Sequence, residues 1–489
     1  MKNGKTMKHS KKQQVYEDIA RRIKAEEWPY GGRLPKMTEL CRHYGVSIIT
    51  LVGAMELLKE AGLVEQRRGS GTYVRWTRDR IFFPELDLKG RTVEVTHSLL
   101  NAPPLYMFIM RQLADSFMRV YSDVKIRFVN LPVSRDQEDP YIQRITSCDV
   151  PCCGEFYWHA IYAKLDALFP LEDLPGYEAL KSSLMEQCAY TTADSGGKQH
   201  IHALLINLGL PSFGLLHRQW AESLGVNLPR HEITQASILK LLRRGTGEKH
   251  AGFFSLALPL PREWHSVNPY VELLSQGISR DEYELNDART IVRILESEHA
   301  GQALESLEEL LKAAGKRVCL GKENEYFSLG KVGILPFAGT WTLQLIEMLK
   351  SGVLYRAFPL PPVAGTEHYR PFYSGFSVGL FRDGISSARQ KIAAWDWLKF
   401  LFCKQAQEVC SQSMHIPVNK DATPYAAETA PEIWQISKRI LSDAIPQPDF
   451  VGMRRVYSQM SGPLRQFLTQ KINAKECLAL LQKSIRADL

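Results

Sequence analysis

The sequence predicts an α/β protein in two unequal parts. A small winged helix-turn-helix domain is expected over residues 1–75, a linker over 76–91 and a large α/β domain over 92–489. Helical segments followed by a glycine-rich hairpin fill the first part, whereas strand-like and helical segments alternate throughout the second. Charge divides at the same place, because residues 1–80 contain 17 Lys and Arg against 9 Asp and Glu, and residues 81–489 contain 44 of each.

The first predicted helix covers Lys11 to Glu27 and has one apolar face. Its apolar residues recur every four positions: Val15, Ile19 and Ile23. The segment 28–32, Trp-Pro-Tyr-Gly-Gly, ends this helix. A shorter helix is expected from Met37 to Tyr44, and Gly45 suits the left-handed turn that lets the next helix leave at a steep angle.

The third predicted helix, from Ile48 to Ala61, has the position of a recognition helix. Ser47 is placed to cap its N-terminus, and Gly62 closes it. Four apolar residues are expected to face the core: Leu51, Ala54, Met55 and Leu58. The opposite face would be free to enter a DNA major groove.

A hairpin follows this helix and predicts the wing. Residues 63–66 and 72–74 read as its two strands, and Arg67-Arg68-Gly69-Ser70-Gly71 forms the turn between them. Glycines at a hairpin tip permit positive φ and close backbone approach. The paired arginines suit DNA phosphates or the minor groove.

This segment resembles the GntR family of bacterial transcription regulators over about 60 residues. The matching motifs are Leu34-Pro35, Gly45-Val46-Ser47, Thr50, Ala54, Gly62-Leu63-Val64 and Arg68-Gly69-Ser70-Gly71-Thr72-Tyr73-Val74. The resemblance implies DNA binding, but Lys36-Met37-Thr38, Ile48 and Val52 stand where the family usually has its base-reading residues. The predicted DNA-binding residues are Lys36, Ser47, Thr50, Arg67, Arg68, Gly69 and Gly71.

The excess positive charge in the first 80 residues also indicates nucleic-acid binding. We therefore predict operator DNA as a partner. A homodimer is expected, because one winged head covers too little DNA for a secure specific complex. An alternative is a head that binds DNA through phosphates alone, without reading sequence.

The chain is expected to be soluble and cytoplasmic. Residues 1–12 are basic and polar, unlike a secretory signal, and no stretch reaches the ~18 apolar residues of a membrane span. Nine cysteines without regular spacing fit reduced thiols. No metal site is predicted, because the spacing of Cys148, Cys152, Cys153 and His159 matches no standard zinc pattern.

The large domain opens with a strand over 93–96, a helix over 106–121 and a second strand over 124–129, an order that predicts a parallel sheet. Further helices are expected at 161–169, 215–224, 238–242, 271–274, 287–314, 388–403, 433–440, 456–468 and 476–485. Further strands are expected at 252–258, 331–336 and 374–381.

Several ordered pieces of residues 92–489 resemble the family 1 extracellular solute-binding proteins, the sugar-binding components of bacterial ABC importers. These pieces are residues 113–129, Asp194-Ser195-Gly196-Gly197-Lys198, residues 331–335 with Gly339-Thr340-Trp341, Phe358-Pro359-Leu360-Pro361, and residues 393–410 with Pro417-Val418. The resemblance implies two α/β lobes, as in periplasmic binding proteins, with ligand held in the cleft between them. A DNA-binding head in front of such a domain indicates a sensor.

Sugar sites combine aromatic rings with polar groups that hydrogen-bond hydroxyls. The large domain has such residues near the ends of predicted strands, where α/β sheets place their ligand crevices. The resemblance puts Trp341 where solute-binding proteins often have a stacking ring. The predicted carbohydrate-binding residues are Trp341, Trp158, Trp264, Tyr373, Glu155 and Asn101.

The chain is not expected to be an enzyme or to carry a cofactor. GntR-type heads are also fused to pyridoxal-phosphate aminotransferase domains, but Ser437-Lys438-Arg439 lies on a predicted helix, without the strand and loop that a Schiff-base lysine needs. The sequence also lacks a Gly-x-Ser-x-Gly elbow, a phosphate loop and His-Glu-x-x-His.

Overall fold

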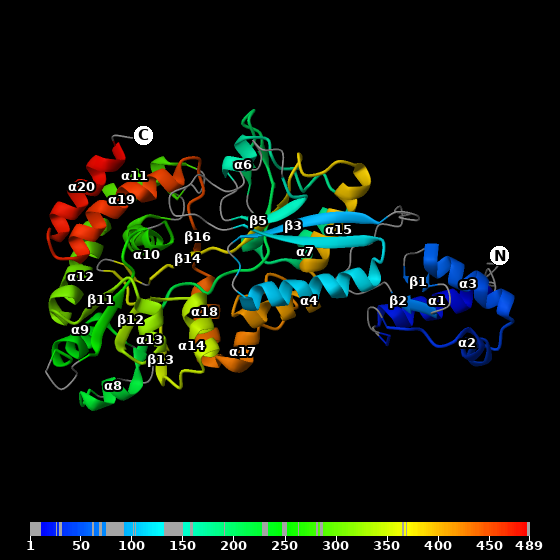
Figure 1. Ribbon diagram of the computed structural model, residues 1–489, viewed down its shortest axis with the longest axis horizontal. Coiled ribbons are helices and arrows are strands. Elements are labelled where there is room, and N and C mark those ends of the chain that lie inside the picture. Colours follow the sequence, from blue (N-terminus) through cyan, green and yellow to red (C-terminus); the bar gives the residue numbers. More distant parts are fainter. Residues whose placement is uncertain are drawn as a thin grey trace, which may run out of the picture.

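The computed structural model shows a small head and two α/β lobes (Figure 1). It describes residues 11–25, 27–28, 32–60, 63–67, 71–74, 92–100, 102, 104–131, 150–156, 160–189, 191–226, 233–246, 252–262, 264–279, 282–283, 287–363, 366–367 and 369–486. Within these residues, no helix is both long and apolar enough to cross a membrane.

The head contains α1 (Lys11–Lys24), α2 (Met37–Tyr44), α3 (Ile48–Glu60) and an antiparallel hairpin of β1 (Val64–Arg67) and β2 (Gly71–Val74). The predicted core positions of α1 and α3 are buried, which confirms both apolar faces. Gly45 has a φ of 61°, which confirms the left-handed turn after α2. The predicted stop at Gly62 lies outside the described residues.

Lobe 1 is built on a five-stranded sheet in the order β4-β3-β5-β15-β8. These strands are β3 (Val93–Leu100), β4 (Val124–Leu131), β5 (Cys153–Phe156), β8 (Leu204–Leu205) and β15 (Ser377–Leu380). Helix α4 (Pro104–Val120) packs against β4, and α15 (Ala388–Leu401) packs against β3. The remaining lobe 1 elements include α6 (Ala160–Lys164), α7 (Tyr177–Ser183), α16 (Lys404–Cys410), α17 (Tyr425–Thr429) and the hairpin of β6 (Thr192–Ala193) and β7 (Gln199–His200).

Lobe 2 is built on a second five-stranded sheet in the order β11-β10-β12-β9-β13. These strands are β9 (Phe213–His217), β10 (Phe254–Leu258), β11 (Val318–Leu320), β12 (Val332–Ala338) and β13 (Tyr355–Phe358). The helices around it are α8 (Arg218–Ser223), α9 (Gln235–Arg244), α10 (Trp264–Leu274), α11 (Arg289–Glu296), α12 (Glu298–Ala314), α13 (Glu323–Ser328) and α14 (Thr340–Leu349), and near the C-terminus α18 (Pro431–Leu441), α19 (Met453–Leu468) and α20 (Ala474–Arg486). Figure 1 shows α19 and α20 on the outer side of this lobe.

Crossing segments connect the lobes. The chain leaves lobe 1 after β8 and enters lobe 2 at β9, so residues 206–212 form the first crossing; it returns through residues 359–376, the second crossing, between β13 and β15. The chain passes between the lobes a third time, into lobe 2, between α17 and α18. Near the second crossing, β14 (Phe372–Tyr373) pairs in parallel with β16 (Ile445–Pro446). Two lobes joined in this way can move relative to each other about the crossings.

The sheets differ from the sequence prediction in two respects. Residues 215–217, predicted to begin a helix over 215–224, belong to strand β9, and the helix α8 starts only at Arg218. The second difference is the direction of some strands. Strands β3, β4 and β5 are parallel as expected, but β15 runs antiparallel to β5 and β8, and β9 runs antiparallel to β12 and β13. The predicted parallel sheet is therefore found only in part, because β9 and β15 enter their sheets from the other lobe instead of after a helical crossover. The helix predicted over 287–314 is also two helices, separated at Ser297 by an extended backbone.

Candidate functional site

The N-terminal end of α3 presents two hydroxyl groups at the surface of the head. The Thr50 backbone N–H donates to Ser47 Oγ at 3.3 Å, which confirms Ser47 as the helix cap. The Ser47 and Thr50 hydroxyls also bond to each other at 3.0 Å. Lys36 is exposed just before α2, where its backbone N–H donates to Glu39 Oε2 at 3.1 Å. These three predicted DNA-binding residues thus lie at the starts of the two helices of the motif.

Part of the predicted wing can be placed. Arg67 ends β1 opposite Gly71, while Arg68 and Gly69 lie outside the described residues. Gly71 has a φ of +124°, and a Cβ there would lie 2.6 Å from Arg33 Nε. The positive φ therefore favours glycine here, and an added Cβ would also displace the end of the Arg33 side chain. Sequence reasoning missed Arg33, an exposed residue just before the Leu34-Pro35 motif.

The exposed face of α3 carries no arginine. Ile48, Ile49 and Val52 are 50%, 82% and 41% exposed, respectively, in the positions expected to contact base edges. The buried residues Leu51 and Met55 lie on the opposite side of the helix. These three exposed apolar residues are called the α3 patch below.

In the large domain, the first turn of α14 lies where the first and second crossings contact each other. Leu210 N–H donates to Thr340 Oγ1 at 2.8 Å, and Gly209 N–H donates to the Ser374 carbonyl at 2.7 Å. Trp341 is 44% exposed beside these contacts, directly after β12. The predicted stacking residue thus lies where the lobes join and near a strand end, where ligand crevices form.

A group of rings from lobe 1 and the second crossing lies in the same region. The rings of Tyr106 and Phe376 stack with centroids 5.8 Å apart, and His415 lies 6.1 Å from Tyr106 and 6.0 Å from Phe376. Phe376 and His415 are both partly exposed. Burial lowers the pKa of His415 to about 4, so its ring is neutral at pH 7. Neutral rings of this kind suit the apolar faces of a sugar.

Glu155 lies beneath this ring group instead of at the surface. It is fully buried on β5, and Tyr106 Oη donates to its Oε1 at 2.5 Å. Burial raises the pKa of Glu155 to about 8 and lowers that of His97, 4.0 Å away, to about 3. Glu155 therefore positions Tyr106 and has no exposed surface for a ligand. The predicted direct ligand contact is corrected accordingly.

The remaining predicted ligand residues have different placements. Tyr373 is only 9% exposed on β14, where its carbonyl accepts from Gln447 N–H at 3.0 Å, so it lies beneath the segment after β16. Trp264 begins α10, but its side chain is not among those described. Trp158 and Asn101 lie outside the described residues. Among the sequence candidates, Trp341 alone is described as an exposed aromatic residue.

Glu272 connects the two crossings to α10. Its Oε1 accepts from Tyr369 Oη at 2.8 Å, and its Oε2 accepts from Ser212 Oγ at 3.2 Å and from Phe372 N–H at 2.9 Å. Ser212 belongs to the first crossing, and Tyr369 and Phe372 to the second. Burial raises the pKa of Glu272 to about 7, although these donors lower it. Its side chain is a buried connection at the hinge.

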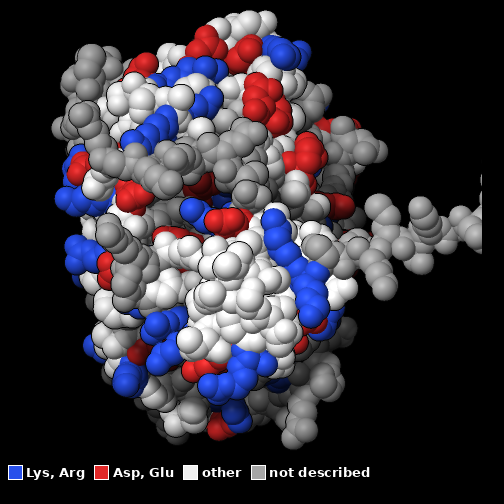
Figure 2. Space-filling view, turned by 90° about the vertical axis from the view of Figure 1, so that its right-hand side faces the viewer, with Lys and Arg blue, Asp and Glu red and all other residues white. Residues whose placement is uncertain are grey.

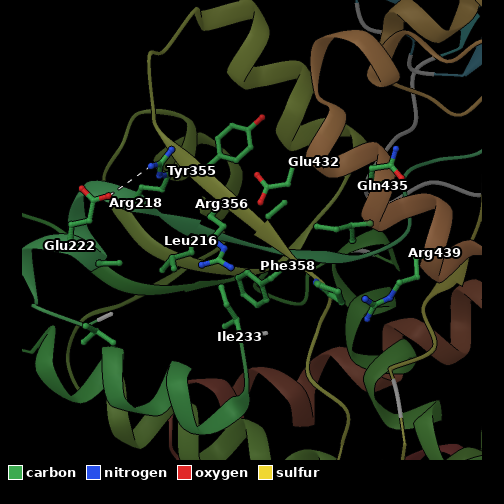
Figure 3. A pocket seen from close by; sticks show the side chains of 15 residues that line it. Leu216, Arg218, Glu222, Ile233, Tyr355, Arg356, Phe358, Glu432, Gln435 and Arg439 are labelled. Carbon is green, nitrogen blue, oxygen red and sulfur yellow. Dashed lines mark ion pairs between the residues drawn. The ribbon is translucent and has the colours of Figure 1, made fainter. Parts of the chain in front are cut away.

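A separate cavity of about 820 Å³ lies along β13, between α8 and α18 (Figure 3). It contains three arginines, Arg218, Arg356 and Arg439, and two glutamates, Glu222 and Glu432. Its volume falls within the range of ~300–1,000 Å³ that is common for ligand pockets. Of the predicted ligand residues whose side chains are described, namely Trp341, Tyr373 and Glu155, none lines it. Within the described part of the chain, no group of His, Cys, Asp and Glu is arranged to hold a metal ion.

Comparisons with known proteins match the head and the large domain to two different kinds of protein. Residues 11–74 match the family described as "Bacterial regulatory proteins, gntR family". The HTH-type transcriptional regulator TreR of Bacillus subtilis is 35% identical over 78 residues, which are 16% of this chain and 32% of TreR. The HTH-type transcriptional repressor STM4068 of Salmonella typhimurium is 28% identical over 97 residues, 19% of this chain and 40% of that protein. The chain thus spans well under half the length of either relative.

Solved structures match the large domain in fold. The ABC substrate-binding protein Lmo0181 of Listeria monocytogenes, in complex with cycloalternan, has a TM-score of 0.64 at 14% identity, over 81% of this chain and 98% of that chain. Maltose-bound MalE3 of T. maritima has a TM-score of 0.65 at 15% identity, over 81% and 100% of the two chains. Residues 11–74 are therefore a GntR-type helix-turn-helix domain, joined in one chain to a domain with the fold of two-lobed sugar-binding proteins.

Proposed function

We propose that this protein is a ligand-responsive transcription regulator whose head binds operator DNA and whose large domain binds a sugar or oligosaccharide between its lobes. The observation that carries the proposal is the presence of both domains in one chain. The solute-binding fold argues against the alternative of an aminotransferase-like domain. No catalytic step is part of the proposal, and a DNA-binding role places the protein in the cytoplasm.

The proposed ligand site is formed by Trp341 and by the rings of Phe376 and His415. Trp341 is exposed after a lobe 2 strand. Phe376 lies at the end of the second crossing, and its ring contacts that of His415 in lobe 1. The comparison with MalE3 supports a carbohydrate ligand, since MalE3 is maltose-bound. Closure of the lobes would bring the two sets of rings around the sugar.

Regulation then follows from a change in the angle and spacing between the two heads of a dimer. A homodimer must match two DNA half-sites at a fixed spacing, about 34 Å for one helical turn, so a modest rotation between subunits moves the heads out of register. We expect a coupling of roughly 1–3 kcal/mol between sugar and operator binding. By linkage, operator DNA must change sugar affinity by the same factor. We propose that the sugar weakens operator binding.

Thermal unfolding of the full chain against a carbohydrate panel tests the ligand class. A sugar at 100 times its Kd should stabilise the protein by ~2.7 kcal/mol. Trp341→Ala should lower that sugar's affinity about 3- to 10-fold, because aromatic contacts contribute ~0.5–1.5 kcal/mol beyond burial. Leu349→Ala is the matched control, since Leu349 is 49% exposed at the other end of the same helix.

Three results would contradict the proposal. Stabilisation by amino acids or peptides, but by no carbohydrate, would exclude the ligand class. Loss of sugar binding in Arg439→Ala, but not in Trp341→Ala, would place the ligand in the cavity along β13. Equal sugar affinities with and without operator would mean that the large domain does not regulate the head.

A further inference from the structure

The α3 patch is exposed although the head does not need it for folding. Ile48, Ile49 and Val52 lie on the side of α3 opposite the buried core residues. Ile49 is 82% exposed, a large fraction for so apolar a side chain. Adjacent exposed apolar residues of this kind mark an interaction surface more often than isolated ones do.

The position of the α3 patch indicates which kind of partner it contacts. In a helix-turn-helix the N-terminal residues of the second helix contact base edges, and the patch occupies the first two turns of that helix. The Ser47 and Thr50 hydroxyls lie at the same end. A partner at this place must therefore offer apolar groups next to hydrogen-bonding edges.

The charge around the patch favours DNA over another protein's apolar face. Lys12 crosses α3 at Gly53, where an added Cβ would lie 3.0 Å from the Lys12 Cδ. Lys36, just before α2, and Lys59, in the last turn of α3, are also exposed on the head. Figure 2 looks onto the end of the molecule where Figure 1 places α3, and it shows an uncharged area bordered by more Lys and Arg than Asp and Glu. An apolar centre with a cationic border matches bases flanked by phosphates.

In the major groove the main apolar group is the C5-methyl of thymine. Three branched aliphatic side chains cannot hydrogen-bond guanine or adenine, but they can pack against thymine methyls. On the basis of the proposed DNA-binding function, we propose that the α3 patch reads thymine methyl groups, so that the operator half-site contains thymines where it meets the start of α3.

The experiment selects bound duplexes from a random pool with the full-length protein. The selected duplex is then compared with versions in which single thymines are replaced by deoxyuridine, which lacks the methyl group but keeps the hydrogen-bonding edge. Each contacted methyl removed should weaken binding about fourfold, the fold-change expected for exposing one methyl-sized group. Ile49→Ala should bind the thymine duplex more weakly and should lose the difference between thymine and deoxyuridine at one position.

Ile49→Ala should fold normally because the side chain is mostly exposed. Leu165→Ala, which removes a 53% exposed apolar side chain from lobe 1, is the control and should keep full discrimination. A selected sequence without deoxyuridine sensitivity, for example a guanine-rich one, would overturn this inference while leaving operator binding intact. Failure to bind any duplex, even at low salt, would overturn both this inference and the proposed function. A change in oligomeric state in Ile49→Ala without DNA would instead assign the patch to contact between copies of the chain.

Discussion

Glu272 allows a quantitative test of the hinge. The carboxylate is 2% exposed and accepts hydrogen bonds from both crossings. Burial raises its pKa from the ordinary 4.5 to about 7, because the charged form loses its hydration and the three donors compensate only in part. The group therefore holds its proton more tightly in the folded protein than in the unfolded chain.

The sign and size of the pH effect follow from this difference. A carboxyl whose pKa is raised on folding stabilises the protein most below pH 4.5, and this contribution is lost as the pH rises from 4.5 to 7. The shift corresponds to about 3 kcal/mol, at ~1.4 kcal/mol per pH unit. Above pH 7 this contribution to stability is lost completely, because Glu272 is then ionised in both the folded and the unfolded protein.

Glu272→Gln removes this titration and keeps the shape of the side chain. We expect the free energy of unfolding of the wild type, relative to the variant, to fall by about 3 kcal/mol between pH 4.5 and pH 8. Urea unfolding of the full chain at a series of pH values, followed by tryptophan fluorescence, measures this difference. Other titrating groups are common to both proteins and cancel.

The exposed Glu305 on α12 provides the matched control. Glu305→Gln makes the same chemical change at an exposed position outside the crossings, so it controls for effects of the substitution that do not depend on the hinge. If Glu272→Gln shows a constant free-energy difference from the wild type across the same pH range, Glu272 is not a buried titrating group, and its assignment as the hinge connection is refuted.

Two further predictions concern the wing and the second crossing. Arg67→Ala with Arg68→Ala should lower the dependence of log K on log salt by roughly one unit per lost phosphate contact, and an unchanged slope would exclude both arginines from DNA binding. Gly375→Ala should destabilise the large domain by about 1–3 kcal/mol, because its Cβ would lie 1.8 Å from the Asn207 carbonyl oxygen. Gly462→Ala, with no atom within 4 Å of the added Cβ, is the control, and equal thermal stabilities of the two variants would contradict this reasoning.

The head could be predicted from local patterns in the sequence. The four-residue period of α1, the Gly45 turn and the Ser47 cap all depend on neighbours within a few residues, and the structure confirms each of them. Arg33 could not be foreseen, because its contact with Gly71 depends on how the chain before α2 pairs with the wing.

In the large domain, the sequence predicted the strands β3, β4, β10, β12 and β15, most of the helices and the position of Trp341 after a lobe 2 strand, since periodicity and motif order are local properties. Only the tertiary structure decided the direction of β9 and β15, which depends on passage between lobes. It also decided that Tyr373 and Glu155 are buried while Phe376 is partly exposed. The hydrogen-bond partners of Glu272 lie 60 to 100 residues away along the chain, and no local pattern encodes a contact at that separation.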